Sequence, residues 1–518
     1  MKKHGAVAAG HEVTARAAAR VLDDGGNAFD AVVAAMWAAC VAEPVLASLG
    51  GGGFVMARPA GEPPRLYDFF VETPLEKRSR EDLEFESRLA TFAGGVTQEF
   101  HGGYGSVAMP GVVAGLFEIH DDLATLPMAQ LAEPAIDAAR NGVVLDDFQR
   151  YVMGIVEPLL GFSAESRAVF GKPGHTDEAG FELLGTGARH VQSDLADSIE
   201  YLVRTGADGF YRGDIGHALI RECREFGGYL GADDLAAYRV LVRDPLLVGG
   251  RKGRFVLNPP PASGGVLVGF GLKLAREMAL GGFGSARHLE AMSQIIHATG
   301  LVRGEYGATS AILSDELCER YRLMIGERPL SQQGTTHISV VDEDGNLAAA
   351  TISNGSSSGR IVPQTGIMMN NMLGEADLSP DGFHMWPCGV RMTSMMTPAL
   401  YLGDDGGAIA LGSGGSNRIR STMLQVLLNI DAFDMTLHGA VSAPRMHVED
   451  SLLSVEPGFD DALLDQLSLE NQSRWDREDM FFGGVHAAKV SADGGRFSAV
   501  GDARRNGNQI IGLSEQGV

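Results

Sequence analysis

The sequence comprises 518 residues, of which 45% are hydrophobic, 21% charged and 7% aromatic, proportions typical of a folded globular protein and unlike those of a disordered chain. The net charge is −24 and no run of Lys and Arg stands out, which argues against a nucleic acid as partner. Glycine contributes 69 residues, about twice its ordinary usage of roughly 7%, and indicates many tight turns.

The chain shows no sequence feature of membrane insertion, secretion or metal binding. Its longest apolar run, Ala31–Ala42, falls well short of the roughly 20 residues that a spanning helix needs. The two lysines near the N-terminus precede no apolar stretch, so we expect a cytoplasmic location. Because the four cysteines lack CxxC spacing and no HExxH motif occurs, we predict neither a metal nor a cofactor.

The first two-thirds of the chain have mainly helical spacing. Apolar residues at helical intervals predict a helix over 14–24, which stops at Gly25-Gly26, and a second over 28–42. The glycine run 50–53 leads into a buried strand at Phe54. A charge-rich surface segment is expected over 76–100, followed by mainly helical structure from about 110 to 330.

After residue 330 the apolar period changes from helical spacing to alternation. Asp344-Gly345-Asn346 is a hairpin turn signal between two alternating segments. We predict strands over 335–341, 347–353, 367–371 and 408–411, and a helix over 419–430. Helices first and paired strands later favour an α/β (α+β) fold with layers of helix, sheet, sheet and helix.

Thr335 is the first candidate nucleophile, in the segment Gly334-Thr335-Thr336-His337. A threonine hydroxyl needs a nearby base, and cutting the preceding peptide bond would supply the residue's own α-amine, whose ordinary pKa lies near 8. Gly334 suits such a cut because glycine tolerates a strained backbone. Without further context, a polar strand start explains the same residues. His337 should share a strand face with Thr335 and support it.

Two other polar segments could assist acyl transfer. Gly414-Gly415 follows a predicted strand and could present backbone N–H groups to an oxyanion. Thr393-Ser394 places two hydroxyls in an apolar stretch, suited to bind a substrate carboxylate. A plain strand-end turn and ordinary turn capping are the structural alternatives for these segments.

A serine nucleophile is the rival within the sequence. The segment 355–359 has the G-x-S-x-G spacing of an esterase elbow. That elbow requires a helix directly afterwards, whereas Pro363 and the β-branched residues before it make a helix start improbable. The esterase hypothesis is therefore the weaker one.

Taken together, these segments resemble the γ-glutamyltransferase family of the N-terminal-nucleophile hydrolases over nearly the whole chain. The resemblance rests on the segments GAVAAGHEVTARAAARVLDDGGNAFDAVVAA, EPVLASLGGGGFV, GSVAMPGVVAGL, NPPPASGGVL and TTHISVVDEDGN. It implies a four-layer αββα sandwich and autoproteolysis between Gly334 and Thr335. Residues 1–334 would then form a large subunit and 335–518 a small one, intertwined as one unit and capable of forming a homodimer of the pair.

The resemblance also implies roles for individual residues. Thr335 corresponds to the nucleophile, and Gly414 and Gly415 to the oxyanion hole. Ser353 matches the threonine that assists the nucleophile, and Asn354 lies one place before the position of the family's asparagine. Thr393 and Ser394 match the hydroxyl pair that holds the glutamate carboxylate, and Glu375 falls where an aspartate contacts the α-amine.

Two positions depart from the family pattern. Phe70 stands where an arginine pairs with the substrate α-carboxylate, and Met372 stands where a Gln or Glu contacts the α-amine. A hydrogen bond to a charged group contributes about 1.5–3 kcal/mol. The machinery that breaks the amide bond is therefore expected to be more complete than the site that recognises glutamate.

The leading hypothesis is transfer of a γ-glutamyl or related acyl group from a small amide such as glutathione to water or an amine, through acyl-Thr335. The first alternative is the same mechanism on another side-chain amide, as in cephalosporin or glutaryl acylases. The second is a non-catalytic paralogue that binds a small molecule without self-cleavage.

Overall fold

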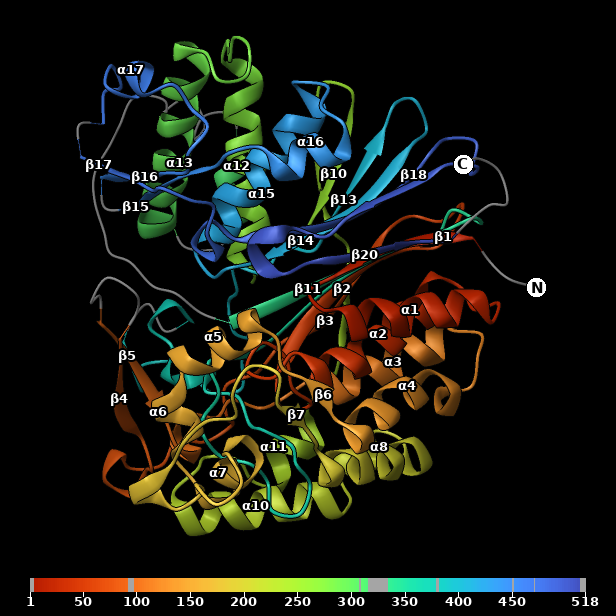
Figure 1. Cartoon of the computed structure of the whole chain (residues 1–518), viewed down its shortest axis with the longest axis vertical. Coiled ribbons are helices and arrows are strands. Elements are labelled where there is room, and N and C mark those ends of the chain that lie inside the picture. Colours follow the sequence, from red (N-terminus) through yellow and green to blue (C-terminus); the bar gives the residue numbers. More distant parts are fainter. Residues whose placement is uncertain are drawn as a thin grey trace.

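The computed structural model describes residues 4–91, 97–306, 309–314, 334–378, 382–449, 451–469 and 471–512. Its two main sheets are antiparallel and lie face to face, each covered on its outer side by helices (Figure 1). The helices α12, α13, α15 and α16 cover the six-stranded sheet, and α1–α4 cover the seven-stranded one. The predicted four-layer arrangement is confirmed.

The seven-stranded sheet holds the start of the predicted small subunit at its centre. Its order is β20-β1-β11-β12-β2-β3-β8. The bounds are β1 Gly5–Ala9, β2 Gly52–Arg58, β3 Arg65–Phe69, β8 Leu241–Arg243, β11 Gly334–Asp342, β12 Leu347–Gly355 and β20 Asn508–Ile511.

The second sheet has six strands in the order β19-β18-β14-β13-β10-β9. The bounds are β9 Leu246–Gly249, β10 Gly253–Leu257, β13 Ala399–Gly403, β14 Ala408–Gly414, β18 Gly484–Val490 and β19 Phe497–Val500. Three small sheets comprise β4 Glu86–Thr91 with β5 Thr97–Gly102, β6 Val143–Val144 with β7 Arg189–His190, and β15 Met446–Glu449, β16 Leu452–Val455 and β17 Gln472–Arg474.

The helices are α1 Glu12–Asp23, α2 Ala28–Ala42, α3 Val112–Leu123, α4 Met128–Asn141, α5 Asp147–Ile155, α6 Glu157–Leu160, α7 Ala164–Phe170, α8 Ser193–Thr205, α9 Asp208–Tyr211, α10 Asp214–Phe226, α11 Ala232–Ala237, α12 Ser263–Glu277, α13 Ala286–Tyr306, α15 Arg418–Asp431, α16 Leu437–Ser442 and α17 Asp461–Leu464. Short 3₁₀ turns include η5 Met372–Gly374, η7 Met480–Phe482 and η8 Ala503–Arg505. Within the described residues, no helix is long and apolar enough to cross a membrane.

The alternation of side chains in β1 divides the core between two layers. Ala6 and Ala8 join the apolar cluster that includes the second sheet, whereas Val7 and Ala9 pack with α1 and α2. This is the period of two that a strand buried on both faces requires. At the far end of β11, the Asp342 carboxylate accepts a hydrogen bond from the backbone N–H of Ala28 at 2.9 Å. Strand β11 is thereby attached to the first residue of α2.

One expectation for the secondary structure is wrong. The segment 367–371 forms no strand and contributes only isolated bridges, Gly50 to Met369 and Ile361 to Met368. The side chain of Asn370 bonds instead to the carbonyl oxygens of Gly50 and Ala108, at 2.8 and 2.9 Å. The described part of the stretch 110–330 is mainly helical, as expected, and it also contains the hairpin of β9 and β10 at one edge of the second sheet.

Candidate active site

Thr335 lies at an irregularity near the start of β11, where the pairing with β12 shifts register between Gly334 and Thr336. Such a bulge re-aims a side chain locally. The Thr335 hydroxyl donates a hydrogen bond to the carbonyl oxygen of Gly334 at 2.7 Å. The Ser353 hydroxyl donates to the same oxygen at 2.7 Å. Both hydroxyls therefore meet at the peptide bond that the sequence predicts to be cut.

Gly414 and Gly415 lie beside this peptide, at the end of β14. A Cβ atom added at Gly414 would overlap the carbonyl oxygen of Thr335, so only glycine allows this approach of the two backbones. Gly415 has φ +127°, a conformation that side chains rarely adopt. The end of β14 therefore lies against Thr335, and the oxyanion-hole role of the two glycines stays a prediction.

A pocket beside Thr335 brings together most of the predicted substrate contacts. We call it the acyl pocket. Thr335 and Ser353 line it, together with Phe70, Met372, Glu375, Thr393, Ser394 and Arg303. These positions come from segments far apart in the sequence, and the fold assembles them around the candidate nucleophile.

The polar groups of the acyl pocket have few partners of their own. The Thr393 hydroxyl is buried without a hydrogen-bond partner among the described residues, whereas the Ser394 hydroxyl accepts a bond from the Met396 N–H at 3.1 Å. Glu375 is 4% exposed, and its Oε1 also has no partner within the described part of the chain. Burial, with the nearby charge of Asp377, raises the Glu375 pKa well above its usual range. Burial therefore favours the protonated form of this carboxyl.

One end of the acyl pocket is apolar, as Phe70 and Met372 predict. Both side chains are 1% exposed, and the Phe70 ring stacks on Phe54 with centroids 5.3 Å apart. Arg391 does not replace the missing arginine. Its guanidinium donates to the carbonyl oxygens of Asp68 and Phe70, at 3.0 and 2.7 Å.

Asn354 is not brought to the nucleophile. Adjacent side chains on a strand point to opposite faces, so Asn354 faces away when Ser353 faces Thr335. It does not line the acyl pocket, and its side-chain amide has no partner among the described residues. At Gly355, an added Cβ atom would collide with Asn371 Oδ1 and with Glu375. The space for the family's asparagine is therefore already occupied.

The rival serine elbow lacks the required geometry. The segment 355–359 forms the end of β12 and a turn, and no helix follows it. The Ser357 hydroxyl lies 2.8 Å from the sulfur of Met368. No histidine accompanies it among its recorded hydrogen-bond partners.

Comparison with known proteins identifies the family of this chain. The family model for gamma-glutamyltranspeptidase matches residues 14–512. The chain belongs to the gamma-glutamyltranspeptidase family. It is accordingly an enzyme of this N-terminal-nucleophile class, as the sequence predicted.

Two relatives in the gamma-glutamyltranspeptidase class illustrate its range. The glutathione hydrolase proenzyme of Escherichia coli (strain K12) is 28% identical, over 96% of this chain and 90% of the relative. The acylase ACY 1 proenzyme of Pseudomonas sp. (strain SE83) is 29% identical, over 95% and 90%. The crystal structure of cephalosporin acylase from Bacillus halodurans superposes with a TM-score of 0.85 at 22% identity, over 98% of this chain and 96% of that one. This likeness confirms the fold.

A buried carboxyl behind the nucleophile escaped the sequence analysis. Glu43 follows α2, is 2% exposed, and accepts hydrogen bonds from the hydroxyls of Thr14, at 2.6 Å, and Thr336. Burial raises its pKa to about 7, and the two hydroxyls partly oppose that rise. The sequence offered one signal for this residue, because Glu43 stands between the helix predicted over 28–42 and Pro44.

Glu43→Gln is expected to change how stability depends on pH. The folded-state pKa of Glu43 lies above its ordinary 4.5, so the stabilisation is present at low pH and is lost as pH rises through about 7. Between pH ~5 and ~8 the wild type should lose up to about 3 kcal/mol relative to the variant. Thermal unfolding of both proteins at the two pH values measures this. Parallel pH profiles would contradict it.

His337 supports the strand rather than the nucleophile directly. Its ring nitrogens lie 2.7 Å from the Thr351 hydroxyl and 2.9 Å from the Ser339 hydroxyl. Complete burial lowers the pKa of His337 well below its usual value. The neutral ring therefore links β11 to β12 through hydrogen bonds.

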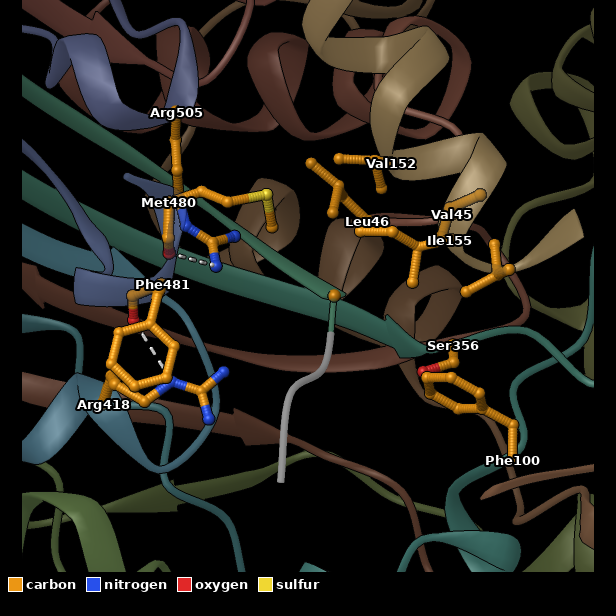
Figure 2. A pocket seen from close by; sticks show the side chains of 12 residues that line it. Val45, Leu46, Phe100, Val152, Ile155, Ser356, Arg418, Met480, Phe481 and Arg505 are labelled. Carbon is orange, nitrogen blue, oxygen red and sulfur yellow. Dashed lines mark hydrogen bonds between the residues drawn. The ribbon is translucent and has the colours of Figure 1, made fainter. Parts of the chain in front are cut away.

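Three arginines near the cut were also missed. Arg303, at the end of α13, lines the acyl pocket and donates to the Asn417 side chain at 2.5 Å. Arg418 and Arg505 line a second pocket together with Gly334 (Figure 2). Single arginines in helical or turn segments carry no recognisable spacing, so sequence patterns could not indicate them.

Thr393→Val should weaken substrate binding without weakening the fold. The native hydroxyl has no partner in the described structure, so an isosteric apolar replacement should cost less than about 1 kcal/mol of stability. Loss of a hydroxyl donor to a charged substrate group should raise KM about tenfold. Steady-state kinetics and thermal unfolding together check both parts.

Thr397→Val is the matched control for this change. The Thr397 hydroxyl donates to the Met395 carbonyl oxygen at 2.9 Å, so its loss should lower stability by about 1 kcal/mol and leave KM unchanged. The expectation for Thr393 is wrong if both variants shift KM equally.

Proposed function

We propose that this chain is a proenzyme that cuts itself between Gly334 and Thr335 and then transfers a γ-glutamyl or closely related acyl group from a small amide to water or an amine. The observation that carries the proposal is the Thr335 hydroxyl, held 2.7 Å from the Gly334 carbonyl oxygen beside Ser353 and Gly414. Relatives named as proenzymes support the processing step. The two fragments would be residues 1–334 and 335–518.

The processing step follows from this geometry. The Thr335 oxygen attacks the Gly334 carbonyl carbon, the C–N bond breaks, and the released nitrogen takes the hydroxyl proton and becomes the α-amine. Water then hydrolyses the ester, which leaves a carboxylate on Gly334 and restores the Thr335 hydroxyl. The freed amine has an ordinary pKa near 8 and so serves as the base for the next reaction.

The catalytic cycle uses the same atoms. The α-amine of Thr335 accepts the hydroxyl proton while the oxygen attacks the substrate carbonyl carbon. Gly414 and Gly415 stabilise the oxyanion through their backbone N–H groups. The C–N bond breaks, the amine leaving group takes the proton, and an ester on Thr335 remains. Water or a second amine attacks this ester, gives up its proton and releases the acyl product.

A second acyl class is favoured by the apolar end of the pocket. Phe70 and Met372 offer no partner to an α-carboxylate or an α-ammonium group, and burial disfavours the charged form of Glu375 that would pair with a cation. A glutaryl-like group, which lacks the ammonium, meets fewer of these costs. Release of p-nitroaniline from γ-glutamyl and glutaryl p-nitroanilides separates the two classes. Preference for the glutaryl compound would replace the leading proposal.

Glu375→Gln should distinguish the two acyl classes further. Binding of an ammonium group favours the charged carboxylate, so for a γ-glutamyl donor the wild-type kcat/KM should rise as pH rises. The glutamine variant should lose this rise and increase KM at least about tenfold. A glutaryl donor, without an ammonium group, should show little change. An equal effect on both donors would contradict contact between Glu375 and the substrate ammonium group.

The homodimer and the cytoplasmic location stay predictions.

A further inference from the structure

The turn that follows α2, residues 43–46, contacts both chain neighbours of Thr335. We call it the 43–46 turn. Glu43, its first residue, accepts a hydrogen bond from the Thr336 hydroxyl. A Cβ atom placed on Gly334 would lie only 3.1 Å from the carbonyl oxygen of Val45. The residues directly before and after the candidate nucleophile therefore both lie against one short segment of the predicted large subunit.

The 43–46 turn is itself fixed by other parts of the chain. The last two carbonyl oxygens of α2 accept hydrogen bonds from the side chains of Gln149 and Gln192, the latter at 2.9 Å. Val45 has φ +75°, a conformation that a β-branched residue adopts only where the surrounding structure imposes it. A strained backbone that persists beside a reacting peptide indicates a role in that reaction.

The hydrogen bond to Glu43 acts at the point where the strand ladder is irregular. The pairing of β11 with β12 shifts register between Gly334 and Thr336, so the ladder does not by itself fix the orientation of Thr335. The buried Thr336 side chain directs its hydroxyl to the end of α2, whereas the Thr335 hydroxyl is directed to the Gly334 carbonyl oxygen. The bond to Glu43 therefore sets how the strand is rotated beside the cut.

Stability of the fold does not explain a carboxyl at this position. Glu43 is 2% exposed, and within the described part of the chain its oxygens accept hydrogen bonds from the Thr14 and Thr336 hydroxyls rather than pairing with a cation. Removal of a carboxylate from water is costly, and hydroxyl partners compensate only part of that cost. An apolar side chain would fill the same space with less loss of solvation.

We propose that Glu43 is a positioning residue, which acts through Thr336 to hold Thr335 in the orientation needed for the cut and for later acyl transfer. The inference rests on the proposed function and extends it. Neither Glu43 nor Thr336 lines the acyl pocket, so the contact orients the nucleophile and does not bind substrate. After the cut, the same contact joins the fragment 1–334 to the new N-terminus of the fragment 335–518.

Thr336→Val tests the contact, because valine keeps the shape of threonine and removes the hydroxyl. The fragments split before Thr335 are followed over time during cell-free synthesis of the full chain. Processing should slow at least about tenfold, as expected when a bond to a charged group is lost and a reacting group moves. Thr336→Ser restores the hydroxyl and should process at the wild-type rate.

Turnover by the mature protein gives a second measurement. Thr336→Val should lower kcat on the γ-glutamyl or glutaryl p-nitroanilide at least about tenfold and leave KM within about twofold of the wild type, because no substrate contact is removed. A variant that merely destabilises the fold would not show this division between kcat and KM. An equal loss in both constants would overturn the positioning role.

Thr14→Val is the matched control. It removes the other hydrogen bond to the same carboxylate, 2.6 Å long and donated from α1, so it should lower the melting temperature and leave the processing rate unchanged. Glu43→Leu should slow processing as much as Thr336→Val does. The double variant should be no slower than either single one, because both changes act through one contact.

The outcomes separate this inference from the proposed function. A wild type that never splits would overturn both. A wild type that splits and cleaves a donor, with Thr336→Val equally fast, would overturn the positioning role alone. Equal slowing by Thr14→Val and Thr336→Val would also overturn it, because a general loss of stability would then explain both. If Glu43→Leu does not fold, the comparison of valine with serine at position 336 still decides.

Discussion

Thr335→Ala is expected to remain a single chain of 54.8 kDa under denaturing conditions, while the wild type separates into fragments split before Thr335. The alanine side chain has no oxygen to attack the Gly334 carbonyl, and no acyl-enzyme can form. Activity on any amide should fall by at least about 10³-fold, the scale seen when a nucleophile is removed. Intact mass and p-nitroaniline release measure the two effects.

Thr335→Ser is the matched control, because serine keeps both the hydroxyl and the α-amine. It should still split and retain measurable turnover. A split alanine variant would contradict the nucleophile assignment. An unsplit wild type would favour the non-catalytic paralogue that the sequence left as an alternative.

Gly414→Ala is expected to lower both processing and turnover, because the added Cβ atom displaces the backbone at Thr335. The added Cβ atom would overlap the Thr335 carbonyl oxygen and approach Arg505 Nη1 at 3.1 Å. The first clash is with main chain, which rotation of a side chain cannot relieve, so β14 and β11 must separate. Displacement of a reacting group by about 1 Å costs about 10²-fold in rate. Processing rate and kcat should both fall by this order.

Gly495→Ala provides the comparison for Gly414. Gly495 is exposed, and the nearest atom to an added Cβ there lies 3.7 Å away. This variant should split and turn over like the wild type. Normal processing in Gly414→Ala would show that the approach of the two strands is not needed for the chemistry.

Much of the fold follows from local sequence patterns. Gly25-Gly26 marks the end of α1, and the alternation after Thr335 marks β11 with its hairpin to β12. The segment 367–371 has a similar strand-like sequence, but the Asn370 side chain donates hydrogen bonds to the carbonyl oxygens of Gly50 and Ala108. Such pairing depends on chain segments distant in sequence, which a local pattern does not contain.

The candidate site was predictable where the resemblance supplied positions. Ser353, Glu375, Thr393 and Ser394 lie together in the acyl pocket with Thr335. Asn354 was misplaced because a shift of one residue on a strand moves a side chain to the opposite face. Glu43, Arg418 and Arg505 were missed because only their burial and neighbours distinguish them.

The order of strands in the seven-stranded sheet has a consequence for the cut protein. Strand β1 belongs to residues 1–334 but lies between β20 and β11, which both belong to 335–518. The two pieces are therefore joined by main-chain hydrogen bonds along one shared sheet and should migrate together on a sizing column. Unfolding then releases two independent chains, so the melting temperature of the mature protein should rise with its concentration, as in a dimer. Refolding after heating should be slow and second-order in protein, whereas the intact Thr335→Ala chain should refold at a rate independent of dilution.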